Sequence, residues 1–203
     1  MSFLDVHKKA NFPQLTPSPL TLWKIALCLT LFLFYLPGAS STIYAQDGSC
    51  PNLVTDGSFE SGRGWTIESN GNYSVFSDVQ AHTGGQAAYL AGMDNADDLL
   101  STTVDLPTDA SSLTFNFWWK VNSEDMRDPS DELKVQVADR NGKALETVFT
   151  VGSNRASKRW RQNSVDLSQF AGQTIQLQFV AETDGSNITD FFVDDVEVTT
   201  CGG

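Results

Sequence analysis

Short runs in which apolar and polar residues alternate recur along residues 52–198, and none of them has the spacing of an amphipathic helix. The clearest run is Leu113–Val121, in which every second residue from Leu113 onward is large and apolar. The intervening positions are mostly polar: Thr114, Asn116, Trp118 and Lys120. Because successive side chains of a strand point to opposite faces of a sheet, this run predicts a strand with one buried face.

The same pattern predicts further strands, separated by clusters of Gly, Asn, Asp and Ser. These are Leu53-Val54, Phe59-Glu60, Trp65–Glu68, Tyr73–Phe76, Gln86–Ala91, Leu99–Leu106, Leu133–Ala138, Ala144–Val151, Trp160–Leu167, Ile175–Val180 and Phe191–Val198. Asn141-Gly142 indicates a hairpin turn between two of them. Because no crossover helices separate the strands, we expect an all-β fold, a single antiparallel β-sandwich.

The last predicted strand, Thr189–Val198, is rich in aromatic and β-branched residues but contains two adjacent carboxylates, Asp194 and Asp195. One of them must face inward unless a bulge changes its direction, and an inward carboxylate is costly unless it is paired or binds a cation. The segment suited to meet it lies far upstream, at Cys50–Glu60. We therefore expect the two ends of the domain to lie side by side.

The N-terminal residues follow the order of a secretory signal peptide, with Lys24, an apolar run at Ile25–Leu36 and a polar stretch that ends in Ala45. The apolar run is shorter than the roughly 20 residues of a membrane-spanning helix. We predict that residues 1–45 are removed and that residues 46–203 form one domain, secreted or at the cell surface. An uncleaved segment that anchors the domain to a membrane is the alternative.

Two of the three cysteines, Cys50 and Cys201, lie at the two ends of the predicted mature domain. Exported proteins form disulfides, so the simplest prediction is a bridge between them. Two unpaired thiols or an intermolecular link are the alternatives.

The chain has 25 Asp and Glu residues against 13 Lys and Arg, a formal net charge of −12. Nucleic acids and anionic membranes bind basic surfaces, so this charge argues against both as partners. It suits a soluble secreted protein and equally a protein that binds cations.

Several motifs resemble known families. Leu53–Glu60, Gly64-Trp65 and His82–Ala88 resemble the opening of carbohydrate-binding jelly rolls of the galactose-binding-like superfamily, which accompany secreted glycoside hydrolases. Later motifs resemble the MAM-type relatives found in secreted metallopeptidases: Leu113–Phe115, Asp131–Val135, Val165–Gln173 and, shared by both groups, Phe191–Val198. The resemblance implies a jelly roll that binds a carbohydrate or cell-surface glycan, or another extracellular protein.

The resemblance also implies a structural calcium ion between the first and last strands. Glu60 and Asp194 would be its side-chain ligands, with Asp195 as an alternative to Asp194. Backbone carbonyls near Asp56 and Gln86 would complete the shell, and calcium accepts such mixed oxygen ligands. The alternative is that Glu60 and Asp194 are solvated or pair with Arg63.

Trp118 is the candidate for contact with a sugar, because it shares its predicted strand face with polar residues. An exposed aromatic ring offers a flat surface on which a sugar ring stacks. The candidate hydrogen-bonding neighbours are Asn116, Lys120, Gln136 and Gln178. Long loops that cover the sheet would bury Trp118 instead.

Two charged segments are further candidates. The acidic loop Asn122–Glu132 would hold a second cation or would simply be solvated. A basic cluster would contact an anionic polysaccharide or an acidic partner, or would balance that loop: Arg155, Lys158, Arg159 and Arg161.

Catalytic functions find little support. The predicted mature domain has a single histidine, His82, which excludes a multi-histidine zinc centre, and no nucleophile motif surrounds it. A pair of carboxylates for glycoside hydrolysis is compatible with any acidic sequence. We expect a non-catalytic module that binds carbohydrate. A MAM-like protein-interaction or adhesion domain without a sugar site is the rival, and a small hydrolase is a weaker third option.

Overall fold

A computed structural model describes residues 50–123 and 130–202 of the chain. The predicted signal segment and residues 124–129, at the centre of the predicted acidic loop, lie outside the described residues. Within the described residues, no helix is long and apolar enough to cross a membrane.

The described residues form ten strands and two short 3₁₀ turns. The strands are β1 (Thr66–Ser69), β2 (Phe76–Ser77), β3 (Ala87–Leu90), β4 (Asp97–Asp105), β5 (Ala110–Ser123), β6 (Glu132–Ala138), β7 (Ala144–Gly152), β8 (Arg161–Asp166), β9 (Thr174–Glu182) and β10 (Thr189–Gly202). The turns are η1 (Ser153–Arg155) and η2 (Ser168–Phe170).

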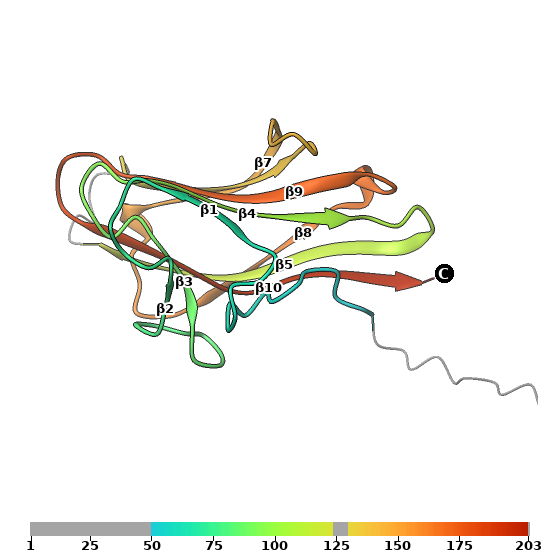
Figure 1. Ribbon diagram of the computed structural model, residues 1–203, viewed down its shortest axis with the longest axis horizontal. Helices are drawn as coiled ribbons and strands as arrows, with labels where there is room; N and C mark the ends of the chain where they lie inside the picture. Colours follow the sequence, from blue (N-terminus) through green and yellow to red (C-terminus); the bar gives the residue numbers. More distant parts are fainter. Residues whose placement is uncertain (1–49, 124–129, 203) are drawn as a thin grey trace, which may run out of the picture. The chain divides into compact units, whose positions relative to one another are not determined.

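The strands pair antiparallel in two five-stranded sheets that face each other (Figure 1). One sheet has the order β1-β4-β9-β6-β7 and is called here the upper sheet, after its place in Figure 1. The other has the order β2-β3-β10-β5-β8 and is called the lower sheet. The prediction of an all-β antiparallel sandwich is confirmed.

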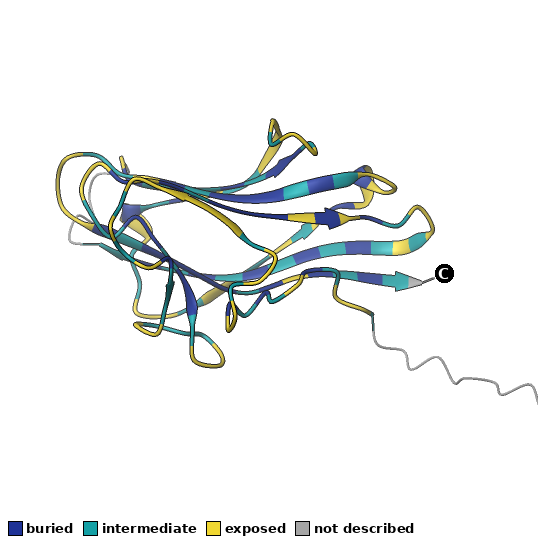
Figure 2. Cartoon of the chain, viewed as in Figure 1, coloured by how far each residue is buried: buried dark blue, intermediate teal, exposed yellow. Residues whose placement is uncertain are grey.

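The alternation in the sequence appears as alternation of burial, which Figure 2 shows along the strands. In β5 the apolar residues face the core, whereas Asn116 and Trp118 face outward and are half-buried. Phe179 of β9 meets Phe115 and Phe117 of β5, with ring centroids 6.2 and 5.6 Å apart. These rings join the two sheets into one core.

Two predicted strands are absent from the described part of the chain. Residues 53–60 form turns rather than strands, because Asp56 and Phe59 adopt left-handed backbone conformations with φ of 52° and 60°. A single β-bridge, Asn52 with Thr199, is the only strand-like pairing in this part of the described chain. Phe59 is fully buried and packs against Trp65, 4.9 Å away. The apolar residues that resembled strands in the sequence are therefore core residues that lie in turns.

The first and last segments of the domain are joined, as predicted. A disulfide links Cys50 to Cys201, with Cα atoms 4.6 Å apart. Leu53 N donates to Val198 O at 2.8 Å, and Val196 N donates to Gly57 O at 2.9 Å. A Cβ on Gly57 would lie 1.8 Å from Val196 O, so only glycine permits this approach.

Candidate functional site

A bulge in β10 determines where the two acidic residues of the last strand point. Asp194 lies opposite Trp118 of β5, and β10 then carries one more residue than β5 before the next pair. Asp195 has a left-handed backbone conformation, with φ of 45°. Both carboxylates consequently meet the β2–β3 loop (Asp78–Gln86) on the outer face of the lower sheet.

Asp194 is a fully buried carboxylate that receives backbone donors. Its Oδ2 accepts His82 N at 2.7 Å and Thr83 N at 3.2 Å, and its Oδ1 accepts the backbone N of Asp195 at 2.7 Å. Burial raises the pKa of Asp194 to about 6, although these hydrogen bonds act in the opposite direction. No ion pair joins Asp194 to a cationic side chain within the described residues.

Asp195 holds the same loop through side chains. Its Oδ2 lies 2.6 Å from His82 Nδ1, and its Oδ1 accepts Thr83 Oγ1 at 2.5 Å. Asp194 and Asp195, the two adjacent residues at the bulge, therefore both fix the middle of the β2–β3 loop through their carboxylates.

Glu60 fixes the end of this loop. Its Oε1 accepts Gly85 N at 2.7 Å and Gln86 N at 3.1 Å. A Cβ on Gly84, whose φ is 62°, would lie 2.2 Å from the same oxygen, so the loop needs glycine there. Oε2 of Glu60 has no hydrogen bond to any described residue. Glu60 and Asp194 thus converge on one loop from two segments of the chain.

Asp56 points elsewhere. Its carboxylate accepts Ser61 N and Arg63 N, both at 3.1 Å, and its carbonyl accepts Trp65 Nε1 at 3.0 Å. Among the described residues, the Arg63 side chain forms no ion pair with Glu60. Glu60 and Asp194, the two predicted side-chain ligands, thus both bind the β2–β3 loop, whereas the Asp56 carboxylate does not.

Trp118 is covered by the β2–β3 loop. The His82 ring stacks on the Trp118 ring, with centroids 3.9 Å apart and planes inclined by 18°, and Trp160 meets the edge of His82 at 5.6 Å. Lys120, on the same sheet face, hydrogen-bonds to Gln80 of the loop. The platform predicted for a sugar is thus already occupied, on one side of Trp118, by a residue of the protein.

Gln136 and Gln178 do not neighbour Trp118, which corrects the predicted grouping. They lie on the outer face of the upper sheet, directly opposite each other on β6 and β9. Alternation in a sequence tells which residues share a face of a strand, but it does not tell which of two sheets the strand joins.

The outer face of the upper sheet has a hollow of about 440 Å³. Its floor contains Leu99 and Val180, which are directly paired across β4 and β9. Gln178 also lines it and is 5% exposed. The volume falls within the roughly 300–1,000 Å³ of small-molecule sites, which combine apolar walls with a few polar groups.

One wall of the hollow is acidic. It contains Glu68 and Asp97, whose carboxylates form no hydrogen bond or ion pair with described residues. Asn70 holds this wall, because its Oδ1 accepts Asp97 N at 2.9 Å and its Nδ2 donates to Asn95 O at 2.8 Å. Asn70 therefore fixes the backbone at Asp97, and the wall presents two carboxylates that have no described partner.

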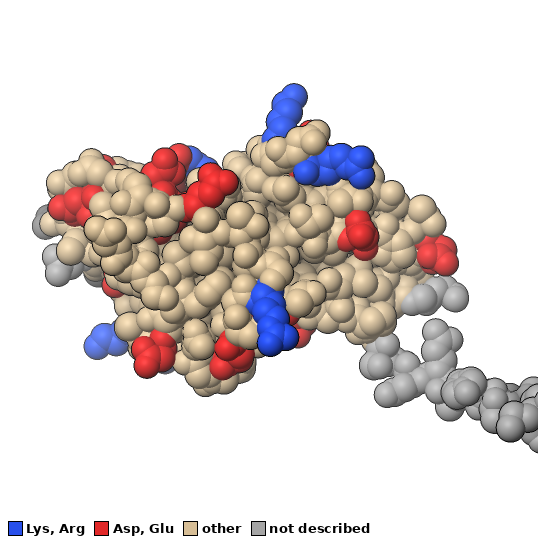
Figure 3. Space-filling view, viewed as in Figure 1, with Lys and Arg blue, Asp and Glu red and all other residues tan. Residues whose placement is uncertain are grey.

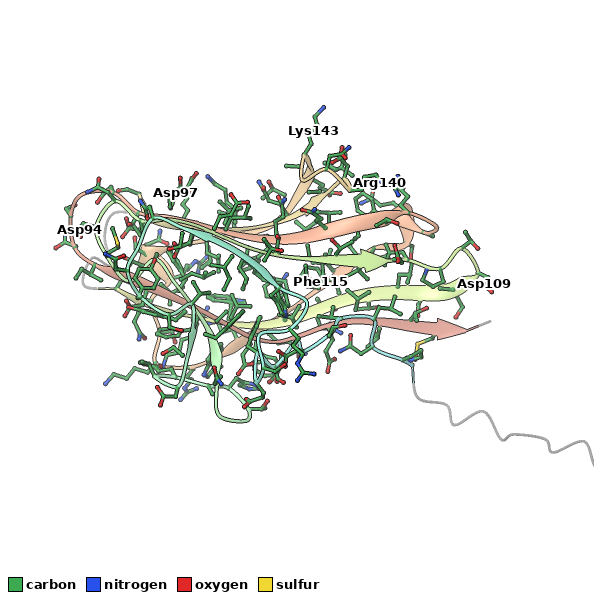
Figure 4. All side chains as sticks on the ribbon, viewed as in Figure 1. Asp94, Asp97, Asp109, Phe115, Arg140 and Lys143 are labelled. Atoms are coloured by element: carbon green, nitrogen blue, oxygen red, sulfur yellow. A yellow bond between two sulfur atoms is a disulfide. The ribbon has the colours of Figure 1, made fainter. Side chains whose placement is uncertain are left out.

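The opposite wall is the β6–β7 hairpin. Gln178 Nε2 donates to Gly142 O at 3.1 Å, so the hairpin leans over the sheet face. Figure 4 labels Arg140 and Lys143 on this hairpin and Asp97 at a distance from it along the upper sheet. Asp97 and Gly142 of the hairpin both line the hollow. In Figure 3, acidic and basic side chains are scattered over this view and form no single large patch of one sign.

Glu68, Asp97 and Leu99 were not predicted as site residues. The Asn141-Gly142 motif predicted the hairpin itself, but nothing in the sequence indicated that this hairpin would lean over the outer face of the upper sheet.

A family model for the MAM domain (meprin/A5/mu) matches residues 52–202. The chain belongs to the MAM domain family. The match covers every strand of the sandwich, so this MAM domain is the whole of the fold described above. No curated protein matches the chain.

Solved structures share the fold of this MAM domain. The carbohydrate-binding module TmCBM61, solved with β-1,4-galactotriose, is 18% identical, with a TM-score of 0.55 over 74% of this chain and 99% of that one. The K3 cleaved adhesin domain of Lys-gingipain from Porphyromonas gingivalis W83 is also 18% identical, with a TM-score of 0.53 over 73% of this chain and 99% of that one. At these identities the likeness shows the fold alone.

Proposed function

We propose that this MAM domain is a non-catalytic module that binds carbohydrate in the hollow of the upper sheet, outside the cell. The observation that carries the proposal is the hollow itself, with its apolar floor at Leu99 and Val180 and its available carboxylates at Glu68 and Asp97. A sugar ring presents an apolar face of C–H groups and a rim of hydroxyl donors, which match that floor and those acceptors. The galactotriose bound by TmCBM61, on the same fold, supports this class of ligand.

The Trp118 site is a weaker candidate. A sugar would reach the covered side of the ring only after His82 moved, and His82 is held by both Asp194 and Asp195. The hollow needs no such rearrangement. We therefore assign sugar contact to Gln178 and the acidic wall rather than to Trp118, Asn116 and Lys120.

Removing the charge of the acidic wall should weaken glycan binding about tenfold, because hydrogen bonds to charged groups are stronger than those to neutral ones. The variant is Glu68→Gln/Asp97→Asn, measured on a glycan array and then by calorimetry with the best ligand. Trp118→Ala, on the other sheet, is the control and should bind normally.

Three results would contradict parts of this proposal. A wild-type array with no signal would reject glycan binding and favour the adhesion function, which the Lys-gingipain adhesin domain of the same fold makes the rival. Loss of binding in Trp118→Ala alone would move the site to the lower sheet. Release of reducing sugar would make the domain a hydrolase.

We further propose a structural calcium ion between Glu60 and Asp194. Support comes from Glu60 Oε2, which has no described partner, and from Asp194, which is fully buried without a described cationic partner. The ion would neutralise these carboxylates and tie the first segment of the domain to the last. Asp194 and Asp195 both accept hydrogen bonds from the β2–β3 loop, so the ion would share its carboxylate oxygens with these donors. The Asp56 carbonyl accepts Trp65 Nε1 and is less suited, whereas the Gln86 carbonyl stays a predicted ligand.

Chelation by EDTA should lower the melting temperature by about 5 °C, because removal of a ligand specific to the folded state destabilises that state. The Asp194→Asn variant should melt at the same temperature with and without EDTA. Asp109→Asn, an exposed carboxylate at the far end of the sandwich (Figure 4), is the control and should keep the sensitivity. An unchanged wild-type melting temperature would reject the ion.

Secretion is the third part of the proposal. The Cys50–Cys201 disulfide supports an oxidising compartment, since such bonds persist outside the cytosol. The predicted signal peptide agrees with that location.

A further inference from the structure

The edge of the lower sheet carries a cluster of cations that the glycan hollow does not use. Four of the 13 Lys and Arg residues of the chain fall within seven residues, from η1 to the start of β8. All four side chains are exposed: Arg155, Lys158, Arg159 and Arg161. In a chain of net charge −12, this concentration of positive charge is unusual.

Within residues 50–123 and 130–202, these cations have no acidic partner. None of the four forms an ion pair with a carboxylate of that part of the chain. The backbone that carries them is nevertheless fixed, because Ser157 N donates to Val121 O at 2.9 Å and Arg159 N donates to Ser157 Oγ at 3.2 Å. The positive charges are thus carried by a segment whose backbone is fixed by hydrogen bonds.

A buried donor lies in the same place. Arg161 is directly opposite Trp119 on β5, and its guanidinium lies over the Trp119 ring, 5.6 Å from the centroid. Trp119 is 7% exposed, and its indole N–H has no acceptor among the described residues. Native structures rarely leave a buried donor without an acceptor. The indole N–H of Trp119 is itself a donor, so it adds no acceptor to which the Arg161 guanidinium could bind.

The cluster also has a concave part. Lys158 lines a hollow of about 330 Å³ between its own segment and the end of β5 at Val121. A ring-sized group that carries a negative charge would find apolar contact and a cation together there.

We propose that this edge, formed by Arg155, Lys158, Arg159 and Arg161 beside Trp119, binds the carboxylate or sulfate groups of an anionic polysaccharide. Arginine matches planar and tetrahedral oxyanions with paired N–H donors, and lysine adds a point charge. At physiological salt a charge acts over about 8 Å, so a local cluster attracts an anion despite the acidic remainder of the protein. A duplex nucleic acid, with one charge per roughly 1.7 Å, would extend beyond the cluster and be repelled by the remainder.

This second site is independent of the glycan hollow. The hollow lies on the outer face of the upper sheet, whereas the cluster lies at the β8 edge of the lower sheet. The carboxylates of the glycan hollow would repel the same polysaccharide. The domain would therefore hold neutral sugar and anionic sugar at separate places.

Affinity electrophoresis in gels that contain polygalacturonate, dextran sulfate or neutral dextran tests the proposal with the intact mature domain. We expect the wild type to be retarded by at least one of the two anionic polymers and not by dextran. Retardation by polygalacturonate alone assigns the site to carboxylates, and retardation by dextran sulfate alone assigns it to sulfates. Raising the salt to about 1 M should abolish retardation, since screening then acts within about 3 Å.

A matched pair of variants locates the site. Lys158→Gln/Arg159→Gln should weaken retardation about tenfold, whereas Arg140→Gln/Lys143→Gln removes the same two charge types from the upper-sheet hairpin and should change nothing. Glu68→Gln/Asp97→Asn should also remain retarded, which separates this site from the hollow. No retardation of the wild type, equal loss in both cation pairs, or equal retardation by single-stranded DNA would overturn the proposal.

Discussion

Reduction of the Cys50–Cys201 disulfide is expected to lower the melting temperature by about 10 to 15 °C, because the bond closes a loop around the whole domain. The two cysteines are 151 residues apart in the chain, so the bond closes a loop that includes the whole sandwich. Constraining so long a loop in the unfolded chain is worth about 4–5 kcal/mol in the chain-entropy description. Thermal unfolding followed by circular dichroism, with and without reductant, measures the effect.

The double variant Cys50→Ser/Cys201→Ser is the control for this prediction. It should melt at the temperature of the reduced wild type and show no further response to reductant. A wild type that melts equally with and without reductant would show that the bridge adds little to stability. In that case the backbone bonds from Leu53 to Val198 and from Thr200 to Pro51 would suffice to hold the two ends together.

In calcium-free buffer, the stability of the wild type should fall as the pH rises from about 4 to about 6, because of Asp194. Burial raises its folded-state pKa from the ordinary 3.8 to about 6, so the folded state prefers the protonated form. Its contribution is fully present below the ordinary pKa and is lost as the pH rises through the folded value. A shift of this size corresponds to about 3 kcal/mol. Denaturant unfolding at a series of pH values measures it.

Asp194→Asn isolates that contribution, since the amide does not titrate. The difference in unfolding free energy between wild type and variant should depend on pH only across this window. Asp166→Asn is the comparison. Hydrogen bonds from Ser168 lower the pKa of the exposed Asp166 carboxyl, so the contribution of Asp166 to stability changes with pH in the opposite direction to that of Asp194. If the difference between the wild type and Asp194→Asn stays flat from pH 4 to 7, the assignment is contradicted.

Much of the fold was predictable because burial follows alternation so closely. In β5 every second residue from Leu113 to Val121 is buried, as the sequence indicated. The two ends could be paired from their chemistry, since the two cysteines at the ends of the predicted mature domain have one obvious partner in each other. The strands and the disulfide can both be predicted from local features of the sequence, without knowledge of the tertiary structure.

The candidate sites were harder to predict because they depend on loops. Trp118 occupies the face predicted for it, but the β2–β3 loop places His82 on its ring through contacts more than 100 residues away in the chain. Gln136 and Gln178, predicted as neighbours of Trp118, lie on the outer face of the other sheet. Sequence alternation carries no information on either point.

The extra residue in β10 also determines which of the residues that follow it point into the core. Before the bulge Phe191 and Val193 face the core, and after it Val196 and Val198 do, so the inward positions change from odd to even numbers. Cys201 therefore emerges on the outer side of the lower sheet, where the incoming chain can reach it. A β10 shorter by one residue would point that sulfur into the sandwich, so the kink at Asp194-Asp195 and the covalent closure of the domain depend on the same inserted residue.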